Sequence, residues 1–221
     1  MAATQSPPTP PPTRDRLGFV VDVFRTRRWA RRTVSILSVL LLVGGVALLA
    51  YPFATNLYQS RLQDKLNRQF ASPLLRQKYQ NRDIKVGDSL TRIKIPAINV
   101  DVVVVEGITP TALRAGAGHY PSTPLPCEKG NVAIAGHRTT YGKPFADLDQ
   151  MKAGDQVELD TPVGGCVYQL KRGPYIVDKS DTSVLNSTPD QTLTLTSCHP
   201  KGSAAKRIIV KAVLVRDLKS T

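Results

Sequence analysis

Three residues whose side chains together can perform acyl transfer occur near the ends of strand-like runs. Cys198 closes a β-rich run and is followed two residues later by Pro200, whereas His137 comes shortly after another apolar run. Arg207 opens the last apolar run of the chain. A cysteine is a nucleophile that a histidine can activate by exchanging a proton with it. A guanidinium is suited to holding a peptide carbonyl or a developing oxyanion. These residues therefore indicate a cysteine-dependent acyl-transfer site.

The segments that contain these residues resemble the sortase family. Leu195-Thr196-Ser197-Cys198, preceded by Thr194, is similar to the sortase signature T-L-x-T-C, with serine in place of the last threonine. This serine keeps a hydroxyl group beside the nucleophile. Ile134-Ala135-Gly136-His137 resembles the segment that carries the sortase histidine, and Arg207 opens the following strand as the sortase arginine does.

The resemblance spans about residues 87–216 and is greatest to the actinobacterial class E sortases, on the run GHRTTYGKPF at residues 136–145. It implies a cysteine transpeptidase that cleaves an LPxTG/LAxTG-type sorting signal between threonine and glycine. In that reaction Cys198 attacks the threonine carbonyl, His137 protonates the departing glycine amine, and Arg207 holds the substrate or the oxyanion. The implied partners are secreted proteins that bear a sorting signal, and an amine of a cell-wall precursor.

The resemblance also implies substrate-binding residues, which are Tyr120, Ala135, Thr196 and Ser197. Tyr120 is expected in one wall of the pocket for the second signal position. His199 is adjacent to Cys198, and because successive strand side chains point to opposite faces, it is expected to be non-catalytic. His119 is expected to be structural, with a place in the lining of the site as the alternative.

The remaining cysteines, Cys127 and Cys166, lie near turn signals. With an odd total of three, they either bond to each other and leave Cys198 free, or stay reduced. No cluster has metal-ligand spacing, and Glu128 is the only carboxylate between Thr109 and Lys143. Neither the calcium site of some sortases nor any cofactor is therefore expected.

The second half of the chain is rich in short, β-prone runs separated by turn signals. A period-two alternation such as that of residues 91–95 predicts strands. Further runs occur at residues 100–105, 131–135, 156–159, 167–170, 192–196 and 208–215. Only short helices are expected, near residues 109–115 and 145–151. The pattern predicts an all-β fold, a sortase-like closed barrel of about seven or eight strands.

The N-terminal part has a different organisation. Residues 1–32 are rich in proline and arginine and predict a disordered cytoplasmic tail. Residues 33–53 carry no charge and are long enough for one transmembrane helix of roughly 30 Å. A cleaved signal peptide is the alternative, but bulky residues stand where a cleavage site needs small ones. A stalk is expected at residues 54–85 and the catalytic domain at residues 86–221.

The charges favour a protein of the cell membrane whose catalytic domain lies outside the cell. Seven arginines and two aspartates give residues 1–32 a charge of 7 − 2 = +5, and arginines on that flank place it in the cytoplasm. The remaining excess, 13 − 5 = +8, is scattered without the aromatic residues of a nucleic-acid platform. The rivals are an L,D-transpeptidase, whose arginine stands two residues after its cysteine rather than nine, and an inactive cell-wall-binding module.

Overall fold

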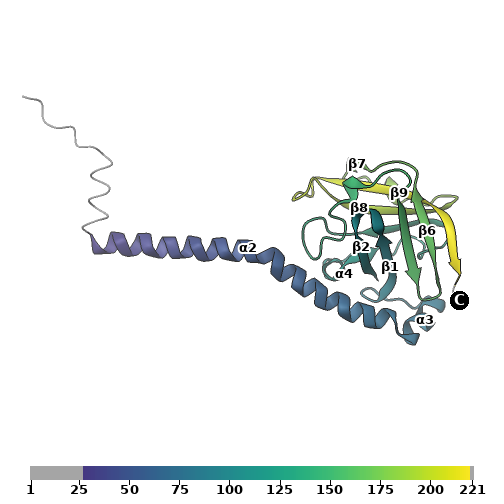
Figure 1. Ribbon diagram of the computed structural model, residues 1–221, viewed down its shortest axis with the longest axis horizontal. Coiled ribbons are helices and arrows are strands. Elements are labelled where there is room, and N and C mark those ends of the chain that lie inside the picture. Colours follow the sequence, from purple (N-terminus) through teal and green to yellow (C-terminus); the bar gives the residue numbers. More distant parts are fainter. Residues whose placement is uncertain (1–26, 220–221) are drawn as a thin grey trace, which may run out of the picture. The chain divides into compact units, whose positions relative to one another are not determined.

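The computed structural model describes residues 27–219, and the chain divides into two compact units at Tyr51 and Pro52. One helix, α2 (Arg28–Phe70), contributes to both units (Figure 1). Its first part is an apolar helix with exposed side chains, such as Leu41 and Leu48. By length and composition α2 can cross a membrane, which fits the predicted anchor.

The second unit contains a closed β-barrel. Within the described residues eight strands form the ring, in the order β6-β5-β1-β2-β3-β4-β8-β9, and a β6–β9 pairing closes it. This closure confirms the predicted barrel. The strands are β1 (Ser89–Ile95), β2 (Val100–Glu106), β3 (Ala117–His119), β4 (Gly130–Ala135), β5 (Gln156–Thr161), β6 (Gly164–Leu170), β8 (Gln191–His199) and β9 (Lys206–Lys219). A further strand, β7 (Tyr175–Asp178), pairs with β9 alone.

Alternation along the strands fills the barrel with apolar side chains. Leu193 and Leu195 of β8 are fully buried in the core, as are Val132 and Ile134 of β4. Because side chains alternate between the two faces, the intervening residues of these strands point away from the core. Two pairings, β2–β3 and β4–β8, are parallel, and the others are antiparallel. The parallel β4–β8 pairing brings the ends of two strands to the same edge.

Helical segments in this unit are short apart from α2. α4 (Pro110–Ala115) lies where the sequence predicts a short helix. It begins after Thr109, whose hydroxyl accepts a hydrogen bond from the Ala112 amide and caps the helix. In the second expected region the structure has a single 3-10 turn, η2 (Leu148–Gln150), without a side-chain cap. Three further short elements are α3 (Pro73–Gln80), η1 (Pro96–Ile98) and η3 (Ser183–Leu185).

The C-terminal part of α2 packs against the barrel through Gln63. The amide of this side chain donates to the Val103 carbonyl at 3.0 Å and accepts from the Val103 amide at 2.9 Å. It also donates to Ala115 at 2.7 Å. β3 pairs with β2 only from Val104 onward, so Gln63 supplies the hydrogen bonds that β3 leaves unmade at Val103. This part of the predicted stalk is therefore built into the barrel wall.

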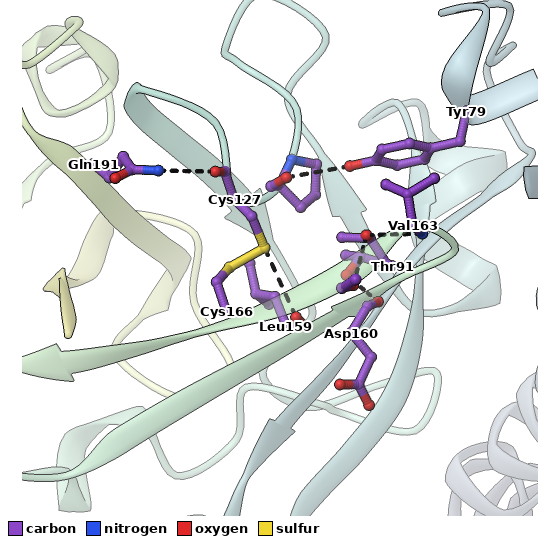
Figure 2. The surroundings of a disulfide bond; sticks show 11 residues. Tyr79, Thr91, Cys127, Leu159, Asp160, Val163, Cys166 and Gln191 are labelled. Carbon is purple, nitrogen blue, oxygen red and sulfur yellow. Dashed lines mark hydrogen bonds between the residues drawn. A yellow bond between two sulfur atoms is a disulfide. The ribbon is translucent and has the colours of Figure 1, made fainter. Parts of the chain in front are cut away.

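A disulfide joins Cys127, in the loop before β4, to Cys166 of β6 (Figure 2). The two Cα atoms are 5.7 Å apart. On the β8 side, Gln191 donates a hydrogen bond to the Cys127 carbonyl at 3.0 Å. The structure thus decides between the two alternatives for these cysteines. Since all three cysteines of the chain lie within the described residues, Cys198 is left as the free thiol.

Candidate active site

The free thiol lies near the end of β8, on the outer face of the barrel. Cys198 is half-buried, and Leu195, three positions earlier, belongs to the core. Thr196 and Cys198 share one face of the strand, which is opposite to the face of Leu195. The thiol is therefore accessible to a ligand while its strand is held by the core.

Arg207 lies directly opposite Cys198 in the antiparallel β8–β9 ladder. Residues opposed in this way have Cβ atoms about 4.5–5.5 Å apart and present their side chains on one face. The guanidinium of Arg207 donates hydrogen bonds to the carbonyls of Ala204 and Lys206, at 3.1 and 3.0 Å. Its charged group is thus held at the turn that joins β8 to β9.

His137 follows β4, the strand on the other side of β8. In the parallel ladder Ala135 pairs with Thr196, and the Gly136 amide continues the ladder by donating to the Thr196 carbonyl at 3.1 Å. His137 and Cys198 each stand two residues after the last pair of this ladder, Ala135 and Thr196. The ends of β4 and β8 and the start of β9 thereby gather the three predicted catalytic residues at one edge of the barrel.

The backbone before His137 is held by close packing. Phe145 is fully buried, and its ring lies so near Gly136 that a Cβ atom there would be 2.6 Å from it. The Phe145 amide also donates to the His137 carbonyl at 3.1 Å. Glycine at position 136 is needed because any side chain would displace this ring. The contact fixes the path of the backbone as it leaves β4 and therefore the backbone position of His137.

The surroundings of His137 favour its neutral form. Burial lowers the pKa of His137 below its usual value, and the positive charge of Arg114 lowers this pKa further. The His137 ring is 5.4 Å from the ring of Tyr141, and the guanidinium of Arg114 lies 5.9 Å from the same tyrosine ring. A histidine in this state is a stronger acid once protonated, which suits donation of a proton to a leaving amine.

The buried Arg138 is a residue of this site that the sequence analysis missed. It is 3% exposed, and it donates to the Cys198 carbonyl at 3.3 Å and to Ala146. It also contacts His199 Nδ1 at 3.0 Å and forms an ion pair with Asp149 at 2.8 Å. The sequence position of Arg138, directly after His137 at the end of a buried strand, could have identified it, because a charged side chain buried there needs partners.

The four predicted substrate-binding residues fall into two groups. Tyr120 and Thr196 are joined through their hydroxyl groups at 3.1 Å, on the strand face of Cys198, and Ala135 is the ladder partner of Thr196. Ser197 is buried on the opposite face, and its hydroxyl donates to the Gly136 carbonyl at 2.8 Å. The first three lie together on the strand face that carries Cys198, whereas the Ser197 hydroxyl connects β8 to the residue after β4.

The two other histidines have partners of their own. His199 lies on the strand face opposite Cys198 and contacts Arg138. His119 is 1% exposed and is hydrogen-bonded through both ring nitrogens, to Glu106 and to the loop after β3. Across residues 27–219, no group of three or more histidine, cysteine or carboxylate side chains gathers in a way that would hold a metal ion.

Comparisons with known proteins give one consistent family. A family model described as the Sortase domain matches residues 93–215. Sortase D of Bacillus subtilis is 34% identical over 130 residues, which cover 57% of this chain and 64% of that protein. Sortase SrtE1 of Streptomyces coelicolor is 31% identical over 146 residues, 59% of this chain and 42% of that protein. The chain thus spans less than two thirds of the length of either relative.

Solved structures agree with this result. The Sortase D5 transpeptidase of Clostridium perfringens aligns with a TM-score of 0.62 and 31% identity, over 72% of this chain and 98% of that one. Sortase E of Streptomyces avermitilis aligns with a TM-score of 0.56 and 33% identity, over 61% of this chain and 93% of that one.

Proposed function

The chain belongs to the sortase family, and from that premise we propose that it is a membrane-anchored cysteine transpeptidase. It cleaves an LPxTG/LAxTG-type sorting signal between threonine and glycine and transfers the new carboxyl end to an amine of a cell-wall precursor. The observation that carries this proposal is the register of three strands. Cys198 opposes Arg207 across β8–β9, and His137 and Cys198 each stand two residues after the last pair of the β4–β8 ladder, Ala135 and Thr196.

The proposed reaction has two steps. The Cys198 thiolate attacks the threonine carbonyl, a thioester forms, the threonine–glycine bond breaks, and the glycine amine leaves with a proton from His137. The acceptor amine then attacks the thioester and passes a proton to His137, while the thiolate of Cys198 is released. Arg207 gives up its hydrogen bonds to the Ala204 and Lys206 carbonyls and donates instead to the substrate carbonyl or to the oxyanion, whose charge it stabilises.

Three features support a role for Tyr120, Ala135 and Thr196 in substrate binding. Tyr120 directly follows β3, Ala135 ends β4, and Thr196 lies in β8 beside Ala135 and two residues before Cys198. The hydroxyl groups of Tyr120 and Thr196 share a hydrogen bond. Class E sortases are associated with alanine at the second signal position. The bulk of Tyr120 at this place favours LAxTG over LPxTG.

The proposed location is the cell membrane, with the N-terminus in the cytoplasm and the catalytic domain outside. It is supported by the apolar part of α2 and by the arginines that precede it. A protease added to spheroplasts tests this orientation. The second unit is degraded if it lies outside, and its protection overturns the assignment.

A transfer assay tests the activity directly. The full-length chain in detergent micelles is incubated with LPxTG and LAxTG peptides and a small primary amine, and the products are identified by mass. The expected product is the peptide cleaved after threonine and joined to the amine, and it is absent for Cys198→Ala. Binding of cell-wall fragments without product would identify an inactive wall-binding module instead. The family assignment removes the L,D-transpeptidase alternative.

A further inference from the structure

We infer that Glu106 and His119 are positioning residues that set substrate selection by holding the loop that carries Tyr120. This inference rests on the proposed function. Glu106 ends β2 and His119 ends β3, and the two are partners in the parallel ladder. His119 Nδ1 lies 2.8 Å from Glu106 Oε2, and both residues are buried.

The second ring nitrogen of His119 holds the loop itself. Nε2 lies 2.9 Å from the Pro124 carbonyl and 3.1 Å from the Thr123 hydroxyl. That hydroxyl donates its one proton to the Tyr120 carbonyl at 2.8 Å, so it accepts from the histidine. A carbonyl oxygen can only accept. Nε2 therefore carries a hydrogen and donates it to both ends of the turn at residues 123–124.

The same hydrogen bonds settle what Glu106 contributes. On the other side of the ring, Nδ1 is hydrogen-bonded to the Glu106 carboxyl group, so the ring is held from β2 and from the loop at once. A buried polar group is tolerated only when it is hydrogen-bonded. Without the Glu106 carboxyl group, Nδ1 loses this partner, and the ring that holds the loop loses its orientation.

A direct path leads from this pair to the predicted nucleophile. Tyr120 follows His119 in the chain, and its amide donates to the Ala133 carbonyl at 3.0 Å. Its hydroxyl is 3.1 Å from that of Thr196, which stands two residues before Cys198 on the same strand face. The direction of the Tyr120 side chain thus depends on the backbone that His119 holds.

Packing alone does not hold the loop, because a cavity of about 350 Å³ adjoins it. The cavity is lined by Ile84, Pro121 and Leu125 together with both members of the pair. Where apolar packing is interrupted in this way, directional hydrogen bonds decide the position of a segment. The pair therefore acts on the site through the loop, without touching the substrate.

The test compares substrate preference in variants of the pair, using the full-length chain in detergent micelles. The probes are LAxTG and LPxTG peptides with a small primary amine, and kcat and KM are measured for each. Glu106→Leu removes the carboxylate and should raise KM for the preferred peptide about tenfold while kcat changes less than about threefold. The ratio of kcat/KM between the two peptides should change about tenfold.

Two further variants separate positioning from stability. Glu106→Gln should restore a near wild-type ratio, because its amide can donate to Nδ1 of a neutral His119 that still donates from Nε2. Thr91→Val is the control, since it removes the hydrogen bond of another buried side chain, to the Asp160 carbonyl in β5. It should lower the unfolding temperature and leave the ratio unchanged.

The outcomes distinguish this inference from the proposed function. Absence of product from the wild type with both peptides overturns both. Product from the wild type, with an unchanged peptide ratio and KM in Glu106→Leu, overturns the inference alone. If Glu106→Leu does not fold, Glu106→Asp replaces it in the test, because it draws the carboxylate back from His119 by one methylene. An unchanged ratio there is equally decisive against the inference.

Discussion

The guanidinium of Arg138 donates a hydrogen bond to the carbonyl oxygen of Cys198 at 3.3 Å. Arg138 directly follows His137, so one buried side chain connects the strand end that carries the predicted acid to the strand end that carries the predicted nucleophile. The second contact of the same nitrogen, at His199 Nδ1, holds the next residue of β8. The relative position of the two predicted catalytic residues therefore depends on a residue that need not touch substrate.

Arg138→Met should lower both stability and turnover. The substitution leaves the Cys198 and Ala146 carbonyls without their donor, which costs about 1–3 kcal/mol for each buried group. Because small misplacements of catalytic groups are expensive, kcat should fall about tenfold or more. Urea unfolding and transfer kinetics at a matched folded fraction measure the two effects. Asp149→Asn keeps the buried guanidinium and serves as control, and wild-type kcat in Arg138→Met would contradict the positioning role.

Substitution of the three predicted catalytic residues should have graded effects. Cys198→Ala and His137→Ala should each abolish the transfer product while the far-ultraviolet circular dichroism spectrum stays unchanged, since both side chains are only half-buried. Arg207→Lys keeps a positive charge but loses the bidentate fork, and should reduce kcat/KM about tenfold, or 1.4 kcal/mol. Near-full activity of Arg207→Lys would show that a point charge suffices there.

Much of the barrel could be predicted from local patterns. Period-two alternation with buried residues such as Leu193 and Leu195 marks strands without knowledge of their neighbours. The three reactive residues were found because each stands at the edge of such a run. The closure of the ring through β6–β9 follows from the number of strands and from the resemblance, because no local pattern specifies which strands pair.

The features that escaped prediction depend on contacts between distant residues. Gln63 reads as one polar residue of a stalk, and only the fold brings it to Val103, 40 positions away. Arg138 reads as a solvated charge until the loop after β4 folds over it. The alternatives for Cys127 and Cys166 stayed open because the distance between β6 and the loop before β4 has no signal in composition or spacing.

Removal of the Arg114 charge should move the acidic limb of the pH–rate profile. The folded-state pKa of His137 is lowered, chiefly by burial and then by Arg114, so Arg114→Gln should raise this pKa. If the reactive form is the thiolate–imidazolium pair, a higher His137 pKa shifts the acidic limb of kcat/KM toward higher pH and increases the maximal rate.

Two controls accompany this measurement. Arg114→Lys keeps the charge and should leave the limb in place. Because Arg114 is exposed, its effect is screened, so the shift should shrink as ionic strength rises. If the acidic limb of kcat/KM stays fixed or moves to lower pH in Arg114→Gln, the charge of Arg114 does not act on His137.

Loss of the disulfide should weaken the fold and spare the chemistry. The two cysteines are 39 positions apart, and opening a loop of that length costs about 3–4 kcal/mol on the chain-entropy account. Cys127→Ser combined with Cys166→Ser should therefore lower the unfolding free energy by about this amount, with kcat near wild type at low temperature. Reductant should destabilise the wild type in the same way but leave the double variant unaffected. A large fall in kcat of the double variant would show that the disulfide also supports the geometry of the active site.

The preference between sorting signals should depend on Tyr120. Its hydroxyl contacts Thr196 at 3.1 Å, and its ring is expected to fill part of the pocket that a proline at the second signal position would occupy. The wild type should therefore prefer LAxTG, and Tyr120→Ala should narrow or reverse this preference by about 1–3 kcal/mol. Competition between the two peptides, followed by mass, gives the ratio directly.

Tyr120→Phe separates the ring from its hydroxyl. It keeps the bulk and should keep the LAxTG preference, with a modest fall in rate from the lost contact with Thr196. Both variants should retain far more activity than Cys198→Ala, because neither removes a reacting group. An LAxTG-to-LPxTG ratio that is the same in Tyr120→Ala and the wild type would show that this ring does not border the second signal position. The wall of that pocket would then have to come from residues outside the loop after β3.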